Sequence, residues 1–262
     1  MTFLETLCAA ASSNRSWICV GLDPDLERLP AGIPRDAEGV ARFNREIIDA
    51  TSDLVCAYKP NSAFYEALGR AGWEALKATI AAVPAHIPVI LDAKRGDIGS
   101  TARAYAEAAF DELGAHAVTL SPYLGGDALS PFLERQDRGC FVLCRTSNPG
   151  GDDLQNLELA GGERLYERVA RLAASQWNGA GNCGLVVGAT YPRELTEVRA
   201  LCPGMPILVP GVGAQGADMA AALAAGGERT IISASRSVLY ADAGPGFAEA
   251  ARAAAIALQL QG

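Results

Sequence analysis

The stretch "HIPVILDAKRGDIG", residues 86–99, runs from apolar residues directly into two acids and two bases. A short, almost continuously apolar run is typical of a parallel strand that is buried on both faces. Asp92 and Lys94 stand two residues apart at the end of this run, so an extended backbone directs both side chains to the same side. The stretch therefore predicts a buried strand whose carboxyl end carries charged groups.

Seven other segments repeat this pattern of a short apolar run followed by polar residues. Segments with helical spacing lie between them: in "VARFNREII" the residues Val40, Phe43 and Ile47 share one face. "TARAYAEAAFDEL", "PRELTEVRAL" and "GADMAAALAAG" are expected to form further helices. The expected strands are 16–23, 53–60, 87–94, 115–122, 139–146, 183–190, 205–212 and 229–236.

Eight alternating strands and helices predict an α/β fold, a single (β/α)8 TIM barrel over residues 1–262, with its active site at the carboxyl ends of the strands. A doubly wound open sheet is the alternative. That fold usually places GxGxxG after its first strand, whereas this chain has "VGLDPD" at residues 20–25. The barrel is therefore favoured.

Composition excludes several classes of protein. The net charge of −8 argues against nucleic acid or an anionic membrane as a partner. No apolar stretch approaches the roughly 20 residues of a membrane span, and "MTFLETLCAAASSNRSW" lacks the basic start of a secretory signal. The 7 cysteines are scattered without a CxxC pair, which predicts a reduced cytoplasmic protein without a zinc site.

Polar residues follow nearly every expected strand, and barrel enzymes build their active sites at that face. A set of polar residues at the ends of nearly all the strands is hard to explain by packing alone. Its members are Asp23, Lys59, Asn61, Asp92, Lys94, Ser121, Ser147, Asn148, Thr190, Gln215, Ser235 and Arg236.

The charged residues at the ends of the second and third strands have two interpretations. Lys59 should neighbour Asp92 and Lys94, because sequential barrel strands are adjacent, and Asp97 follows just before the next helix. The simpler interpretation is an ion-pair network that closes the barrel end, with Asp97 stabilised by a helix dipole. An acid at Asp23 and an anion site favour catalysis instead.

The anion site is expected after strands seven and eight. "PGVGAQGAD", residues 210–218, offers backbone N–H groups at its glycines and the amide of Gln215. "SASRSVL", residues 233–239, adds the amides of Ser235 and Arg236 and the Arg236 guanidinium. Loops in this position commonly bind phosphate in barrels. Turn geometry for the glycines and a surface ion pair for Arg236 are the alternatives.

Five motifs together resemble the orotidine 5′-monophosphate decarboxylase family, in particular its bacterial branch with longer chains. They lie in the family's order and span nearly the whole chain. The resemblance implies conversion of orotidine 5′-monophosphate to UMP in de novo pyrimidine synthesis, by a cytoplasmic homodimer that needs no metal or cofactor. The motifs are "YKPNSAFYE", "LDAKRGDIGSTARAYA", "CRTSNPG", "VPGVGAQG" and "SASRSVLYA".

The resemblance also assigns roles to residues. It implies an alternating catalytic array in which the last acid reaches the neighbouring subunit's site, together with the Ile and Thr that follow. Many relatives have Gly before the phosphate-binding Arg, where this chain has Ser235. The implied catalytic residues are Lys59, Asp92, Lys94 and Asp97; the substrate-binding residues are Asp23 for ribose, Ser147 for the pyrimidine, Pro210 for the base pocket, and Asn61, Ile98 and Thr101; the phosphate-binding residues are Gly213, Gln215, Ser235 and Arg236.

The implied chemistry needs such an array. Loss of CO2 leaves an electron pair at C6 in the plane of the pyrimidine ring, where the π-system cannot delocalise it. A positioned cation is the obvious stabiliser and proton donor, and Lys94 is the candidate. Asp92 and Asp97 should keep it charged until the carbanion forms.

The polar segment 147–162 is expected to form a lid, since long βα loops of barrels often close over the site. A surface insertion is the alternative. Two other functions stay open: a Mg²⁺-dependent sugar-phosphate decarboxylase or aldolase of the same superfamily, which has Glu as a metal ligand where this chain has Lys59, and a non-catalytic nucleotide-binding barrel.

Overall fold

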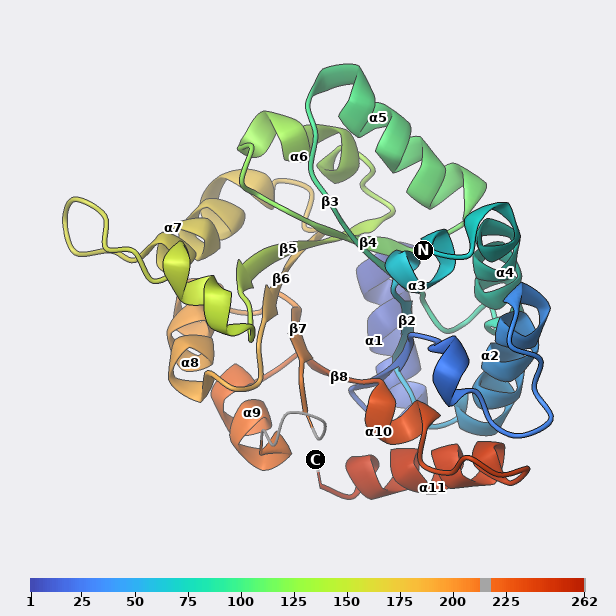
Figure 1. The fold of residues 1–262 in the computed structure, drawn as a ribbon. Coiled ribbons are helices and arrows are strands. Elements are labelled where there is room, and N and C mark those ends of the chain that lie inside the picture. The colour runs from blue at the N-terminus through green and yellow to red at the C-terminus, as the bar shows by residue number, and fades with distance from the viewer. Residues whose placement is uncertain (213–217, 262) are drawn as a thin grey trace.

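The computed structural model describes residues 1–212 and 218–261. In this part of the chain eight parallel strands form one sheet in the order β2-β1-β8-β7-β6-β5-β4-β3. Bridges from Tyr58 to Val89 and from Asn61 to Asp92 join β2 to β3 and close the barrel, which Figure 1 shows along its axis. The strands are β1 (Ile18–Leu22), β2 (Ala57–Pro60), β3 (Ile90–Arg95), β4 (Ala117–Leu120), β5 (Gly139–Arg145), β6 (Cys183–Val187), β7 (Ile207–Pro210) and β8 (Thr230–Ala234).

Helices surround the barrel, so the predicted (β/α)8 fold is confirmed (Figure 1). Short irregular helices extend α5 and α7 or lie in loops: η1 (Leu26–Arg28), η2 (Ala108–Glu112), η3 (Pro149–Asp153) and η4 (Ala173–Trp177). The α-helices are α1 (Phe3–Asn14), α2 (Ala37–Thr51), α3 (Ser62–Glu66), α4 (Gly69–Ala82), α5 (Gly99–Glu107), α6 (Gly126–Leu133), α7 (Leu165–Leu172), α8 (Pro192–Leu201), α9 (Met219–Gly226), α10 (Arg236–Leu239) and α11 (Phe247–Gln259).

Every expected strand is present, with shifted bounds. The largest difference is at β2, which was expected from residue 53 and begins at Ala57. The chain first turns after α2, where the Leu54 N–H donates to the Thr51 carbonyl at 2.9 Å. Leu54, Val55 and Cys56 are buried in this turn. The apolar run in the sequence therefore begins before the strand does.

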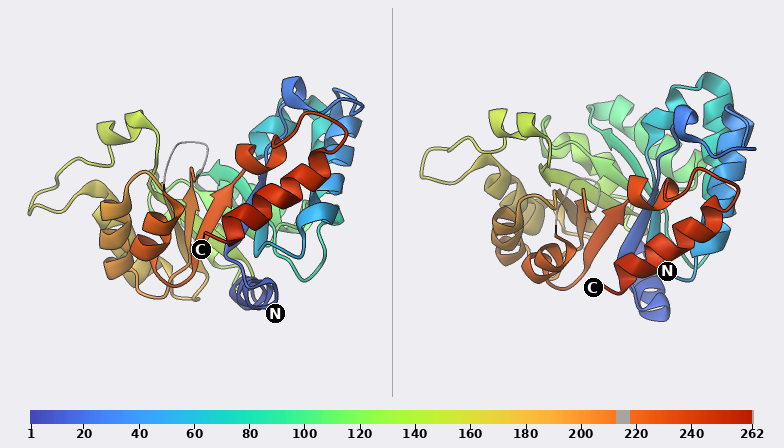
Figure 2. Two further views of the ribbon diagram at one scale, coloured as in Figure 1. Left: turned by 90° about the horizontal axis from the view of Figure 1, so that it is seen from below. Right: turned by 60° about the horizontal axis from the view of Figure 1, so that its bottom comes forward.

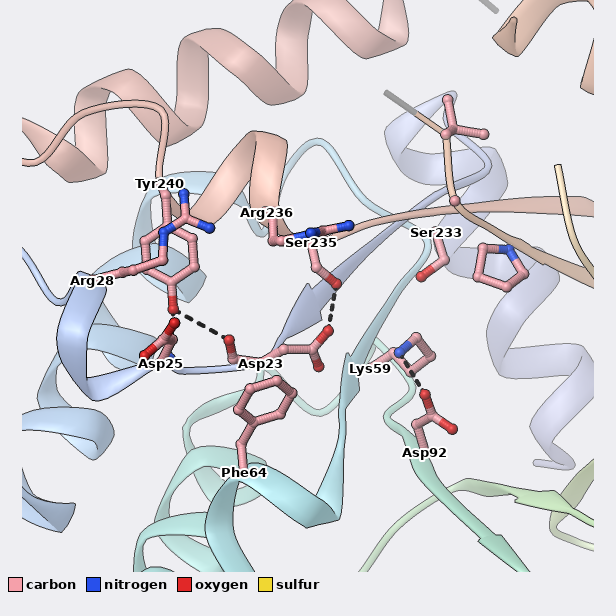
Figure 3. A pocket seen from close by; sticks show the side chains of 13 residues that line it. Asp23, Asp25, Arg28, Lys59, Phe64, Asp92, Ser233, Ser235, Arg236 and Tyr240 are labelled. Carbon is pink, nitrogen blue, oxygen red and sulfur yellow. Dashed lines mark hydrogen bonds and ion pairs between the residues drawn. The ribbon is translucent and has the colours of Figure 1, made fainter. Parts of the chain in front are cut away.

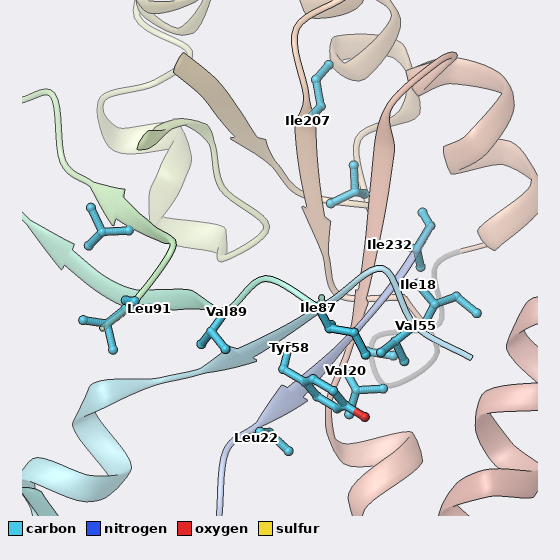
Figure 4. Packing of buried hydrophobic residues seen from close by; sticks show 14 of the residues in the cluster. Ile18, Val20, Leu22, Val55, Tyr58, Ile87, Val89, Leu91, Ile207 and Ile232 are labelled. Carbon is cyan, nitrogen blue, oxygen red and sulfur yellow. The ribbon is translucent and has the colours of Figure 1, made fainter. Parts of the chain in front are cut away.

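The outer core lies between the strands and the helices (Figure 4). Ile18, Val20 and Leu22 of β1 belong to it, and they alternate along the strand as period-2 geometry requires. The predicted face of α2 is confirmed, since Val40, Phe43 and Ile47 are fully buried there. This layer fixes the outward side of each strand and leaves the other side to the barrel interior.

The inner core is smaller, and α1 closes its lower end. Phe3, Leu7 and Ala11 of α1 pack in one cluster with one interior residue from each strand. Figure 2 shows α1 below the barrel, at the end opposite to the loops around η3. This helix was not among the expected elements. The interior residues are Cys19, Ala57, Ile90, Ala117, Phe141, Val186, Leu208 and Ile231.

Within residues 1–212 and 218–261, no helix combines the length and hydropathy that crossing a membrane requires.

Candidate active site

The site is the interior layer above this apolar cluster. Side chains two residues apart on a strand point to the same side, so each interior residue predicts the next one toward the carboxyl end. Moving two residues along every strand leads to a layer that contains four polar side chains, in which Gly21 and Gly188 leave room for Ser235 and Ser147. This upper layer comprises Gly21, Lys59, Asp92, Thr119, Leu143, Gly188, Pro210 and Ser233.

Two cavities open from this layer. One of about 270 Å³ extends toward Asp23 and Arg236. The other, about 440 Å³, extends toward Ser147 and the loop after β5. Both are lined by Lys59, Asp92 and Pro210, so these three residues mark the place where the cavities meet.

The charged centre is a chain of three groups. Lys59 Nζ lies 2.9 Å from Asp92 Oδ2, and Lys94 Nζ lies 2.6 Å from Asp92 Oδ1. Burial raises the pKa of Asp92, but the two ammonium groups outweigh it and hold that pKa well below its ordinary value. Burial likewise lowers the pKa of Lys59, but Asp23 and Asp92 raise it more. Asp92 and Lys59 are therefore ionised at neutral pH.

Lys94 reaches Asp92 by an irregular route. The sequence predicts both residues on a regular strand, whereas the register between β3 and β4 shifts between Leu91 and Arg95. Lys94 itself has φ of +48°, in the left-handed region that non-glycine residues rarely adopt. The two side chains do meet as predicted, but a bulge rather than strand alternation brings them together.

Asp23 is fixed at the end of β1 by two donors. The Ser235 hydroxyl donates to Asp23 Oδ2 at 2.6 Å, and the Asn61 N–H donates to Oδ1 at 3.2 Å. Figure 3 shows Asp23 between Ser235 and Phe64 in the smaller cavity. The Asn61 side chain caps α3 by accepting the Ala63 N–H at 3.1 Å, so Asn61 acts on this cavity through its backbone.

The predicted anion site is partly described. Gly211, Val212, Ser235 and Arg236 all line the smaller cavity, so the loops after β7 and β8 do converge. Gly211 has φ of +100°, which explains glycine there. Gly213 and Gln215, both predicted to bind phosphate, lie outside the described residues.

Asp97, Ile98 and Thr101 line neither of the two cavities at the charged centre. Asp97 Oδ1 accepts the N–H of Ile98 at 2.8 Å, and Ile98 is 58% exposed. Within one copy of the chain, these three predicted residues are therefore not brought to the charged centre.

The loop after β5 is held by Arg145, which was not among the predicted site residues. Arg145 is 1% exposed, pairs with Asp152 at 2.6 Å and stacks on the Tyr191 ring at 3.8 Å. These contacts fix the start of the predicted lid, where Ser147 lines the larger cavity. Arg145 is the last residue of β5, and a charged residue at the end of an apolar strand normally suggests exposure, so its burial was not predictable from the sequence.

Thr119 and Ser233 were also missed, although the step of two residues from Ala117 and Ile231 could have found them. Among the described residues, no three His, Cys, Asp or Glu side chains are grouped as they would be to hold a metal ion.

Known proteins were compared with this chain. Residues 16–253 match the family described as Orotidine 5′-phosphate decarboxylase / HUMPS. An orotidine 5′-phosphate decarboxylase of Herpetosiphon aurantiacus is 66% identical, over 95% of this chain and 94% of that protein. Another from Roseiflexus sp. is 59% identical, over 99% and 96%. The structure of Leishmania donovani OMP decarboxylase superimposes with a TM-score of 0.86 at 44% identity, covering 99% of each chain.

Proposed function

Since this chain belongs to the orotidine 5′-phosphate decarboxylase / HUMPS family, we propose that it is a carboxy-lyase that converts orotidine 5′-monophosphate to UMP in pyrimidine synthesis. The observation that carries the proposal is the Lys59–Asp92–Lys94 chain at the junction of the two cavities. A nucleotide that occupies both cavities places its reacting ring beside this chain.

The cavities suggest how the substrate lies. The pyrimidine occupies the larger one, against Pro210 and within reach of Ser147. The ribose hydroxyls meet Asp23, which Ser235 and the Asn61 N–H hold in place. The 5′-phosphate binds the Arg236 guanidinium, the backbone N–H groups after β7 and β8, including that of Gly213, and the Gln215 amide.

The chemical step uses Lys94 as the proton donor. The bond between C6 and the carboxylate breaks, CO2 leaves, and the electron pair stays on C6 and takes a proton from the ammonium group. Asp92 keeps that ammonium in position at 2.6 Å. A fixed cation near C6 stabilises negative charge more in the transition state than in the substrate, which is what accelerates the reaction.

The reaction in this proposal needs no metal ion or cofactor. The Lys59 ammonium occupies one oxygen of Asp92 and Lys94 occupies the other. Two buried or half-buried cations on one carboxylate oppose the approach of a divalent cation. This arrangement disfavours the Mg²⁺-dependent alternative.

We further propose a homodimer in which Asp97, Ile98 and Thr101 complete the neighbouring copy's site. Their position outside both cavities and the exposure of Ile98 support it. The whole chain, residues 1–262, acts as one catalytic domain, and segment 147–162 covers the bound base as a lid held at its root by Arg145. Free cysteines throughout, six of them buried, suit a reducing cytoplasm.

The test follows the ultraviolet absorbance of orotidine 5′-monophosphate with purified protein, with and without EDTA. We expect loss of the orotate chromophore at the same rate in both. Activity only with added Mg²⁺ on a sugar phosphate would move the assignment to the metal-dependent relatives. Tight binding of UMP without turnover of orotidine 5′-monophosphate would make the chain a binding barrel.

A further inference from the structure

The hydroxyl group of Thr119, on β4, has all of its hydrogen-bonding capacity used by β3. It donates to Asp92 Oδ1 at 2.9 Å and accepts the N–H groups of Ala93 at 3.1 Å and Lys94 at 2.9 Å. A hydroxyl offers one donor and two acceptor sites, so these three bonds saturate it. Thr119 is 1% exposed, which excludes water as a substitute partner.

The bulge in β3 explains why a side chain is needed there. β3 pairs regularly with β4 up to Leu91 and Val118, and the next pair is Arg95 and Leu120. Three residues of β3 thus stand opposite the single residue Thr119. Backbone N–H groups in such a bulge lose their ladder partners. The Thr119 hydroxyl replaces those partners for two of them.

The same bulge sets the direction of the Lys94 side chain. Lys94 holds a φ of +48°, and a residue stays in that region only where its surroundings determine the backbone. Its ammonium then reaches the Asp92 oxygen that also accepts the Thr119 O–H, while Lys59 takes the other oxygen. The Thr119 hydroxyl therefore holds both the bulged backbone of β3 and the Asp92 carboxylate.

We propose that Thr119 is a positioning residue for the decarboxylation, which fixes Lys94 and Asp92 relative to each other through the bulge. This inference rests on the proposed function for its kinetic consequence. Thr119 lines the larger cavity, but its hydroxyl has no site left for a ligand. It acts on the reaction through Lys94 and Asp92.

The test compares Thr119→Val, which keeps the shape and removes the hydroxyl, with Thr119→Ser, which keeps the hydroxyl. Misplacement of a reacting group by about 1 Å can cost about 10²-fold in rate, so Thr119→Val should lose about 10²-fold in kcat with KM changed less than about threefold. Thr119→Ser should stay within about threefold of the native kcat. Thr230→Val is the matched control, because Thr230 is equally buried on β8 and bonds only the Gly227 carbonyl among the described residues.

A second readout does not depend on turnover. Hydrogen exchange in peptides that contain the Ala93 and Lys94 amides should accelerate in Thr119→Val and remain native in Thr119→Ser and Thr230→Val. If the native protein does not decarboxylate orotidine 5′-monophosphate, the proposed function fails, and the exchange data still decide whether Thr119 holds the bulge.

Native kcat in Thr119→Val, or unchanged exchange at residues 93 and 94, would overturn the inference. If Thr119→Val does not fold, Thr119→Ala removes the same hydroxyl without adding a methyl group beside the amides. Equal kcat in Thr119→Ala and Thr119→Ser would then overturn it, and a selective loss in Thr119→Ala would support it.

Discussion

Lys59 and Asp92 form a buried ion pair, with Nζ 2.9 Å from Oδ2 and side chains 6% and 11% exposed. Removing two charges from water is costly, and their attraction repays that cost only while both are present. The loss of either partner should therefore lower the free energy of unfolding, because it leaves the other charge buried without its direct partner.

Substitution of Asp92 by Asn should destabilise the fold, because it removes the carboxylate that pairs directly with the buried Lys59 ammonium and leaves only the more distant charge of Asp23. We expect a loss of about 3–5 kcal/mol in the free energy of unfolding, measured with urea at pH 7. The control is Asp53→Asn, which breaks the exposed pair with Arg252 and should cost less than about 1 kcal/mol. Equal stability of the Asp92 variant and the native protein would refute the buried-pair argument.

The stability that Asp92 contributes should depend on pH in a defined direction. Its pKa is lowered in the folded protein, so its contribution is complete above the unfolded value of about 3.9 and is lost as the pH falls toward the folded value. The difference in unfolding free energy between native protein and Asp92→Asn should be constant from about pH 7 to pH 5 and shrink below about pH 4. A difference that already declines between pH 7 and pH 5 would mean that Asp92 is not held ionised by its lysines.

Ser235 should support ribose binding by holding Asp23. Ser235→Ala removes the donor at 2.6 Å, and one lost hydrogen bond to a charged group costs roughly 1.5–3 kcal/mol at most. We expect KM for orotidine 5′-monophosphate to rise about tenfold with kcat nearly unchanged, the pattern of lost uniform binding. Ser237→Ala is the control, because the Ser237 hydroxyl has no hydrogen-bond partner among the residues that the structure describes. A fall in kcat alone would assign Ser235 to the chemical step instead.

The shared site predicts complementation between two inactive variants. Each site of the proposed dimer takes Lys94 from one copy and Asp97 from the other. In a mixed dimer of Lys94→Ala and Asp97→Ala, one site therefore carries both substitutions and the other carries both native residues. Random reassociation of equal amounts should restore about one quarter of native activity, because half of the dimers are mixed and half of their sites are native. Mixtures as inactive as their components would show that each copy uses its own Asp97.

The upper layer of the barrel interior was predictable from the sequence, because strand periodicity determines which residues point inward. Each apolar interior residue is followed two positions later by a residue of the site, as Ala57 is by Lys59 and Ile90 by Asp92. The barrel was predictable from the alternation of strands and helices, and the convergence of the loops after β7 and β8 follows from the barrel. The meeting of Asp92 with Lys94 was also predicted, but a bulge in β3 rather than strand alternation brings it about.

Other features depend on contacts between residues far apart in the sequence. Thr119 stands 25 residues from Lys94, and nothing in either segment shows that one side chain replaces two ladder bonds of the other strand. The burial of Arg145 depends on Asp152 and Tyr191, from two different loops. α1 packs against the lower end of the barrel because the apolar interior residues would otherwise be exposed there.

The most direct test of the central claim measures kcat for orotidine 5′-monophosphate and the dissociation constant of UMP in Lys94→Ala beside the native protein. If Lys94 delivers the proton to C6, kcat should fall by about 10²–10⁴-fold, while UMP affinity changes by less than about tenfold, or 1.4 kcal/mol. A Lys94→Ala protein that turns over within about tenfold of the native kcat would contradict the account.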